Sequence, residues 1–497
     1  MDLSTIGLKN QLYSEQELDT VRKSRQACTE KLQVLRDEIR RLRCDAERLE
    51  VQIQRSDIAL APHNKLPPEM LLRIFELCCE EPAQIPAQNG SIYTVSHVCS
   101  LWRQIALRTP EFWANISIKL KANNEHKLWI AKQWLSRARN HPRSLKFMEI
   151  GDHTTDGLNQ PLLHNFVINY PCRELHLSPY IQVALLNELL IGPFSGYLEV
   201  LDINCSQTSW ERRWLNLFAP TTRLTKLRHV RLIGVQDCRN LMATIPWNQL
   251  QNLTLLLWIP YSRCLDILSE CASLVRCRIY VEDDTLATPS ARRPITLPAL
   301  RVLRLFFRKA VFGNDGTHVE KMIRFLSVPR LCHLTLGQKV RANITNLGAP
   351  AICELLQRSN GMPDLVSLDI GLRTITPIDV QALLTNAPRL RLLHARSGIF
   401  HEEVRNGIAT GTLTPQLRSI MTDVRHEATD ILRMVELRQQ NAGMTLVDKT
   451  KQVAEFSSIV FFCHSYTSGS QQSSVYRERL ASLKEAAPGL SIDLRFS

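Results

Sequence analysis

One sequence pattern returns eleven times along the chain and constrains its fold more than any other feature. Each copy reads L-x-x-L-x-L with small substitutions, and successive copies begin on average about 27 residues apart. The copies, with their first residues, are LKFMEI (145), CRELHL (172), LEVLDI (198), LRHVRL (227), LQNLTL (250), LVRCRI (274), LRVLRL (300), LCHLTL (331), LVSLDI (365), LRLLHA (390) and LRSIMT (417). A period of two places the leucine-type side chains of a short strand on one face and the intervening side chains on the other. Because each copy buries its apolar face only against its neighbours, we expect a curved solenoid of parallel strands.

The segments between the copies predict the helices that return the chain to the next strand. Three amphipathic examples are residues 181–190, 262–270 and 350–360. The expected fold class is therefore an α/β solenoid of short parallel strands with helices, preceded by an all-α module and an N-terminal helix. We place the solenoid at residues 145–497, with residues 117–144 as a helical linker or N-terminal cap.

The C-terminal part of the chain, residues 423–497, continues the alternation of helix and strand. We expect a helix near 425–440, a strand at 457–464 and a helix near 475–486, with a Ser-rich loop at 466–474 and a final segment SIDLRFS. This region is expected to cap the open end of the solenoid.

The motif and its period resemble leucine-rich repeats. The polar ladder residue of the consensus is absent, the intervals vary, and the last two copies end in Ala395 and Thr422. The resemblance therefore implies irregular leucine-rich repeats rather than a uniform horseshoe.

A second periodic pattern runs from Leu18 to Ile53. Apolar side chains recur there at alternating steps of three and four residues, broken only by Arg25. Residues 1–60 hold eleven basic and eleven acidic side chains, which suits charge pairing along and between helices. A sustained repeat of this kind makes a narrow stripe that needs another helix, so we predict a coiled-coil helix over residues 1–60. The stripe pairs either with a second copy, as a homo-oligomer through residues 18–53, or with the chain's own body.

Residues 66–81, LPPEMLLRIFELCCEE, predict a short helix that is apolar almost all round. Pro67 and Pro68 are tolerated only at a helix start, and a helix of this composition must be buried on more than one side. After a variable loop, the segment VSHVCSLWRQIALRTPEFW predicts a second helix that ends at Thr109-Pro110. About fifty residues cannot bury this much apolar surface by themselves. We therefore expect an unsatisfied apolar patch, unless the downstream domain covers it.

These two segments together resemble the F-box over residues 65–116. The shared features are the LPxE opening, the Ile-Phe helix, and the pattern V-C-x-x-W-R-x-I-A in the second half. The heptad helix upstream and the TPxFW that follows resemble a large group of F-box proteins with this arrangement. The resemblance implies docking onto a Skp-type adaptor, and through it a cullin, in an SCF ubiquitin ligase. The residues that it assigns to the adaptor interface or its support are Leu66, Pro67, Pro68, Ile74, Val98 and Trp102.

Substrate recognition on such a solenoid would depend on the outward strand positions. In the central copies these positions hold Arg231, Arg276, Arg278 and Arg304. Equivalent positions of neighbouring parallel strands lie about 4.8 Å apart, so we expect the side chains to form a column. Guanidinium groups grip carboxylates and phosphates with two hydrogen bonds, which favours an acidic or phosphorylated protein substrate. The alternative is a solvated polar face, because Asn252 and Thr254 interrupt the column.

Several classes of function lack support in the sequence. The chain has no uninterrupted apolar run of membrane-spanning length, and its N-terminus is acidic and polar where an export signal would be basic and then apolar. We therefore expect a soluble protein of the cytoplasm or nucleus that does not bind a membrane. The fourteen cysteines are scattered without a CxxC pair, so we predict buried thiols rather than a metal site or a disulfide framework.

The motif search likewise predicts no enzyme and no cofactor. No phosphate-binding glycine loop, zinc-protease motif or nucleophile elbow occurs. The net charge of +13 makes acidic partners worth considering, and Trp210 and Trp214 beside Arg212 and Arg213 form a combination seen in nucleic-acid grooves. A loop cap on a repeat explains that combination more simply, so nucleic acid is not the expected partner.

The function predicted from the sequence is therefore that of a substrate-recognition subunit of an SCF ubiquitin ligase. In this interpretation the F-box docks the adaptor and the repeat surface binds the substrate. The alternative is a non-catalytic scaffold that uses the coiled coil and the solenoid for assembly, outside ubiquitination. An RNA-binding repeat protein is a third and weaker interpretation.

Overall fold

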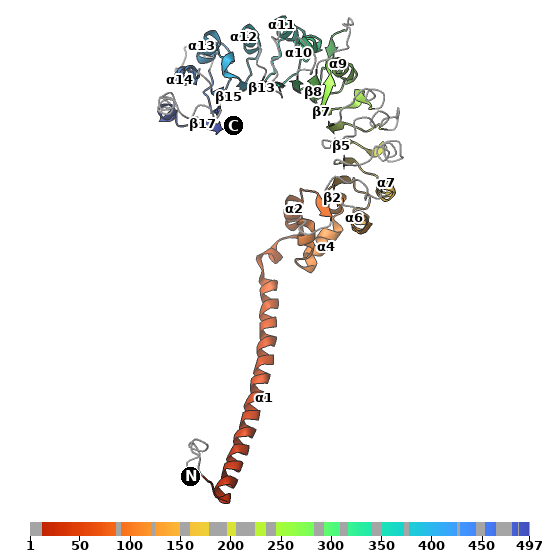
Figure 1. The fold of residues 1–497 in the computed structure, drawn as a ribbon, viewed down its shortest axis with the longest axis vertical. Helices are drawn as coiled ribbons and strands as arrows, with labels where there is room; N and C mark the ends of the chain where they lie inside the picture. Colours follow the sequence, from red (N-terminus) through yellow and green to blue (C-terminus); the bar gives the residue numbers. More distant parts are fainter. Residues whose placement is uncertain are drawn as a thin grey trace.

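The computed structural model describes most of the chain: residues 12–85, 91–120, 125–149, 160–177, 196–204, 224–234, 245–282, 293–308, 317–338, 349–371, 377–424, 428–443, 453–463, 480–485 and 487–496. Figure 1 shows three parts in chain order: a long isolated helix, a small helical module, and an open arc of strands and helices. None of the helices in these ranges combines the length and the apolarity needed to cross a bilayer.

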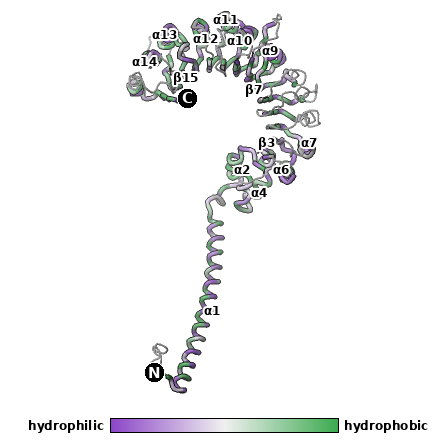
Figure 2. Tube along the Cα trace, viewed as in Figure 1, coloured by the Kyte–Doolittle hydropathy of each residue, from purple (hydrophilic) through white to green (hydrophobic). Residues whose placement is uncertain are grey.

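The N-terminal helix α1 spans Glu15–Leu60, which at 1.5 Å per residue is a rod of about 69 Å. Ser14 caps it through a capping box with Glu17, which satisfies two amide groups of the first turn. The helix gives way to a 3-10 turn, η2, at Pro62–Lys65, because proline cannot donate the amide that the helix would need. No residue of α1 is buried, and the stripe side chains remain exposed at Leu32, Leu35, Ile39, Leu42, Leu49 and Ile53. The described part of the chain therefore does not cover the stripe, and Figure 2 shows its hydrophobic residues spaced along the whole rod.

The helical module follows directly. Its elements are α2 (Pro68–Cys78), β1 (Ala83–Ile85), α3 (Ser91–Ser96), α4 (Ser100–Arg108) and α5 (Glu111–Ala114). Pro68 occupies the first turn of α2, where a missing amide hydrogen costs nothing, as the sequence predicts. The second predicted helix is divided into α3 and α4 by a turn at residues 97–99.

One parallel sheet carries most of the mass. Within the described residues it has fifteen strands in strictly sequential order. The strands are β1, β2 (Asn115–Leu120), β3 (Ser144–Glu149), β4 (Glu174–Leu177), β5 (Val200–Asn204), β6 (His229–Ile233), β7 (Asn252–Pro260), β8 (Arg276–Glu282), β10 (Val302–Arg308), β12 (His333–Gln338), β13 (Ser367–Ile370), β14 (Leu392–Ala395), β15 (Ser419–Val424), β16 (Ser458–Cys463) and β17 (Ser491–Phe496). Each of the eleven predicted segments forms one strand, from β3 to β15, and the sheet does not close on itself.

Helices cover the outer side of the arc, and the strands line its inner side (Figure 1). The helices of this part include α6 (Glu125–Arg137), α7 (Gln160–Asn169), α9 (Tyr261–Glu270), α10 (Thr317–Arg324), α11 (Ala349–Arg358), α12 (Pro377–Thr385), α13 (Glu402–Thr410) and α14 (Ala428–Gly443). The predicted helices at 262–270 and 350–360 correspond to α9 and α11. The prediction for 181–190 lies outside the described residues, as do Trp210 and Trp214.

The leucine-type side chains of each strand point into the core, as the period of two requires. In β10, Leu303, Leu305 and Phe307 are buried, whereas the residues between them face the inner side of the arc. The same alternation holds in β4, β5, β6 and β7. Short additions to the repeats are the small sheet of β9 (Ile295–Thr296) and β11 (Leu326–Ser327), and the 3-10 turns η7 (Trp247–Gln249) and η8 (Ser397–Ile399).

The sheet starts earlier than the repeat pattern indicates. β1 comes from the loop of the helical module and pairs in parallel with β2, and β2 pairs with β3. Ile85 and Ile118 face each other across the first pair, and both are fully buried. The variable loop after the first predicted helix and the linker predicted at 117–144 thus contribute strands to the same sheet as the repeats, and the module and the arc share one core.

Candidate functional site

An exposed apolar stripe on α2 is the first candidate site. Leu66 precedes the helix, and Met70, Ile74 and Leu77 follow at helical spacing on one side of it. Their exposed fractions are 36%, 54%, 39% and 58% in that order. Large apolar side chains gathered on one helix face without cover are typical of a protein interaction surface.

The opposite side of α2 holds the module together. Leu71 and Phe75 lie one helical turn apart and are buried. The ring of Trp102 on α4 packs against Phe75 with 4.8 Å between the centroids. The helix is therefore apolar on two sides, one used for the core and one left outward, which is the arrangement that its composition predicts.

Hydrogen bonds to the backbone fix the angle between α3, α4 and α5. Arg103 Nε donates to the carbonyl oxygen of Ser96 at 2.9 Å, which ties α4 to the end of α3. Trp113 Nε1 donates to the carbonyl oxygen of Ala106 at 2.7 Å, which ties α5 to α4. The stripe on α2 therefore belongs to a module whose helices are connected by side-chain hydrogen bonds to the backbone.

The structure separates the predicted adaptor residues into two groups. Leu66, Pro67, Pro68 and Ile74 are exposed at the start and along the outer face of α2, and Val98 is exposed just after α3. Trp102 is half-buried under α2 and supports that helix. Met70 and Leu77, which the sequence analysis did not name, share this exposed face, and their spacing from Leu66 and Ile74 is the signal that could have found them.

The inner face of the arc is the second candidate site. Thr254, Arg278, Arg304 and Thr335 face one another on the consecutive strands β7, β8, β10 and β12. We call these four residues the arginine row. Arg276 lies two residues before Arg278 on β8, opposite Val302. The structure therefore brings three of the four predicted arginines together.

The fourth predicted arginine, Arg231, is separated from the others by Thr254. Its Nη1 lies 3.5 Å from Oδ2 of Asp202, which also lies 3.3 Å from Nδ1 of His176. A carboxylate on the neighbouring strand therefore neutralises Arg231. The repeat aligns the two residues at the same position of neighbouring copies, and the structure shows that their side chains pair.

Aromatic rings lie beside the arginine row. Trp258, Tyr280 and Phe306 form a continuous strip on β7, β8 and β10, with about 5 Å between successive centroids. The guanidinium carbon of Arg278 lies 5.2 Å from the ring centre of Phe306 and 5.9 Å from that of Tyr280. The sequence signal for this strip is a run of aromatic residues at outward positions of three neighbouring repeats.

The electrostatics of this face reflect the arginines. Burial lowers the pKa of His333, and the nearby charges of Arg304 and Arg276 lower it further. Burial also lowers the pKa of His229, where carboxylates and arginines act in opposite directions. Both imidazoles are thereby biased toward the neutral form, and the positive charge of this region resides on the arginines.

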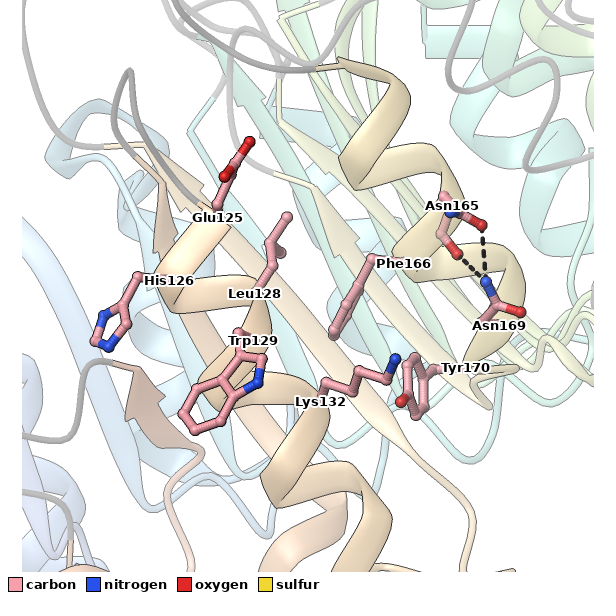
Figure 3. Close-up of a pocket in the computed structure, with 9 residues that line it drawn as sticks. All are labelled: Glu125, His126, Leu128, Trp129, Lys132, Asn165, Phe166, Asn169 and Tyr170. Atoms are coloured by element: carbon pink, nitrogen blue, oxygen red, sulfur yellow. Dashed lines mark hydrogen bonds between the residues drawn. The ribbon is translucent and has the colours of Figure 1, made fainter.

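A groove on the helix side is the third candidate site. It lies between α6 and α7 and has a volume of about 870 Å³, with Trp129, Phe166 and Tyr170 among its lining residues. Figure 3 shows the side chain of Lys132 extending toward Tyr170 across this space. Asn169 Nδ2 donates to the side-chain oxygen of Asn165 at 2.8 Å, so these amides bind each other. The arrangement suits the packing of an apolar group, and we assign no chemistry to it.

The cysteines divide into buried and exposed thiols. Burial raises the pKa of Cys172 and of Cys271 to about 12, so both are protonated at neutral pH and act as small apolar core residues. Cys28, Cys44 and Cys78 are exposed, which differs from the expectation of uniform burial. The described cysteines are free thiols.

Comparison with known proteins concerns the helical module alone. No curated protein matches the chain. Residues 63–119 match the family described as F-box-like. This range contains the exposed stripe on α2 and the helices that brace it, so the helical module is an F-box-like domain.

Proposed function

We propose that this protein is the substrate-recognition subunit of an SCF (cullin–RING) ubiquitin ligase. The observation that carries the proposal is the uncovered stripe of Leu66, Met70, Ile74 and Leu77 within the F-box-like domain. In the proposal, a Skp-type adaptor covers this stripe and connects the chain to a cullin. Val98 adds to the docking surface, and Trp102 holds α2 in place beneath it.

The inner face of the sheet is the proposed substrate surface. It is broad, it is lined by side chains that the fold does not need for its core, and it carries the arginine row. The chain itself performs no bond chemistry in this proposal. It holds a substrate close to the conjugating enzyme at the other end of the ligase, and the raised local concentration accelerates ubiquitin transfer to substrate lysines. An acidic or phosphorylated protein is the class of substrate that this face suits.

We further propose that α1 pairs with α1 of a second copy through residues 18–53. The stripe is exposed over the whole rod, and no described part of the chain packs on it. Isoleucine at Ile39 and Ile53, alternating with leucine at Leu35, Leu42 and Leu49, is typical of parallel two-stranded coiled coils. Free and exposed thiols suit the reducing environment of the cytoplasm or nucleus, which we propose as the location.

The adaptor-docking proposal is tested by Ile74→Asp. An aspartate at the centre of the stripe would have to lose its hydration when the adaptor covers it, so binding should weaken at least about 30-fold, the loss typical of a central interface residue. The measurement is the Kd of the full chain for purified adaptor by isothermal titration calorimetry.

Ile58→Asp is the matched control, because Ile58 is another exposed helical isoleucine that lies outside the module. It should bind adaptor like the unaltered chain. Unweakened binding by Ile74→Asp, with an unchanged circular dichroism spectrum, would contradict the proposal. Adaptor binding without ubiquitin transfer to any captured protein would favour the scaffold alternative.

A further inference from the structure

We propose that the arginine row is a binding site for a phosphorylated side chain of the substrate. The inference rests on the proposed function, because it names the chemistry that the inner face of the sheet recognises. It is carried by four contiguous positions on neighbouring strands: Thr254, Arg278, Arg304 and Thr335.

The row is a line of hydrogen-bond donors built by strand register. Arg278 and Arg304 are direct cross-strand neighbours, and a threonine hydroxyl flanks them on each side. Neighbouring strands lie about 4.8 Å apart, so a single phosphate can reach both guanidinium groups. Two like charges placed side by side destabilise a sheet unless an anion lies between them. The arrangement therefore favours a bound anion.

The side chain of Arg278 is held in position before any ligand binds. It stacks on Phe306 and Tyr280, and its Nη2 lies 3.5 Å from the hydroxyl of Tyr280. Gly337 is the cross-strand neighbour of Phe306 and leaves room for its ring in this position. A Cβ atom at residue 337 would lie 2.6 Å from the ring. A guanidinium fixed by stacking loses little conformational entropy when it binds an anion.

Within the part of the chain that the structure describes, the arginines of the row and Arg276 carry charge that no carboxylate neutralises. Among the described residues, no carboxylate lies within ion-pair distance of Arg278, Arg304 or Arg276. Arg308, on the same face, differs, because it forms an ion pair with Glu282 at 2.5 Å and stacks on Trp258. The Nε of Arg278 is buried without a hydrogen-bond partner in the described structure.

Acidic residues limit the positive region at both ends of the row. Asp202 pairs with Arg231 on one side, and Asp369 lies 2.9 Å from Nδ1 of His394 on the other. Asp369 is the cross-strand neighbour of Thr335. A nucleic-acid backbone needs a continuous basic track, and these carboxylates interrupt it. The positive region between these carboxylates is therefore wide enough for one anionic group and too short for a chain of phosphates.

The donor set favours a phosphate over a carboxylate. Two guanidinium forks side by side can each engage a different pair of phosphate oxygens, whereas one carboxylate has only two oxygens for both forks. A phosphorylated side chain presents three strongly accepting oxygens and close to two negative charges. The inferred ligand is therefore a protein segment with one phosphorylated serine or threonine that lies across β7, β8, β10 and β12.

The test uses the full chain and immobilised peptides with one central phosphoserine and randomised flanking residues. Retention of the protein should exceed retention on the same peptides without phosphate. Arg278→Gln and Arg304→Gln should each reduce the retained fraction at least about tenfold, because each removes a charge-assisted pair of hydrogen bonds. Arg278→Lys, which keeps the charge and loses the fork, should bind at an intermediate level.

Arg231→Gln is the matched control, because Asp202 already neutralises that arginine on the same face. It should retain the peptides like the unaltered chain. Equal retention with and without phosphate, equal losses in Arg231→Gln and Arg278→Gln, or stronger and steeply salt-dependent retention on single-stranded RNA would each overturn the inference. Adaptor binding measured on the same variants separates the two proposals, since loss of peptide capture with adaptor binding intact rejects the arginine row alone.

Discussion

At the scale of single residues, one buried arginine organises the C-terminal end of the arc. Arg438 on α14 is completely buried, and its guanidinium donates to the carbonyl oxygens of Ile408, Thr414, Pro415, Leu417 and Ala454 at 2.5–3.2 Å. Burial lowers its pKa to about 10, so the side chain is still protonated at pH 7. The planar fork suits this task, because it satisfies several carbonyls that water cannot reach.

Arg438→Met should therefore destabilise the protein strongly. The change leaves several buried carbonyl oxygens without donors, and the expected loss in the free energy of unfolding is about 3–5 kcal/mol. Urea unfolding followed by circular dichroism measures it. Arg433→Met, at an exposed position of the same helix, should cost less than about 0.5 kcal/mol. Equal stability of the two variants would show that the carbonyls find other donors.

At the scale of elements, α1 and α2 differ in how much of their apolar surface the chain covers. α2 uses one apolar side for its own core and leaves the other uncovered. No residue of α1 is buried, so packing against the described part of the chain adds little to its stability. An isolated helix of this kind depends on its cap, its charge pairs such as Lys23–Asp19, and a partner helix along its stripe.

Oxidative crosslinking tests the pairing of α1. In a parallel pair in register, the two copies of Cys28 meet in the stripe, whereas Cys44 lies on the outer side of the helix. Mild oxidation of the Cys44→Ser variant, which keeps Cys28, should therefore give a covalent dimer. Mild oxidation of the Cys28→Ser variant should give no crosslink through α1. Sedimentation at monomer mass, or crosslinking that depends on Cys44 instead, would reject the parallel pair.

At the scale of the whole molecule, the F-box-like domain and the arc are one continuous structure. β1 extends from the module into the sheet, and Trp113 joins the module to the first outer helix. Its ring lies 4.9 Å from that of Trp134 on α6, with the guanidinium of Arg137 on its face at 4.5 Å. The exposed stripe of α2 therefore keeps a fixed position relative to the inner face of the sheet (Figure 1), as the proposed function by proximity requires.

Trp113→Ala should loosen this connection. Removal of a buried tryptophan costs about 3–5 kcal/mol, so the variant should melt at a lower temperature and bind adaptor more weakly. Differential scanning calorimetry with adaptor titration measures both effects. Trp129→Ala removes a tryptophan that is 58% exposed on α6, and it should change neither quantity. An unchanged melting temperature in Trp113→Ala would mean that the module folds independently of the arc.

Much of the architecture was predictable because it depends on local periodicity. A period of two determines which side chains of Leu303 to Phe307 face the core, and this holds wherever the strand lies in the sheet. The composition of α2 likewise predicted apolar side chains on two sides of the helix, of which the structure buries one and exposes the other. The register between strands follows the same repeat, because equivalent positions of successive copies pair, as Asp202 does with Arg231 and Arg278 with Arg304.

The sequence alone determined the strands, their inner and outer faces, the long N-terminal helix and the apolar excess of the F-box-like segment, since each follows from the order of residues along one element. The repeat places Asp202 beside Arg231, but only the tertiary structure decided that their side chains approach to 3.5 Å, that Arg278 lies over the ring of Phe306, and that β1 joins the sheet. The physical reason is that charge pairing and stacking depend on distances between residues far apart in the chain, and those distances exist only once the strands are in register.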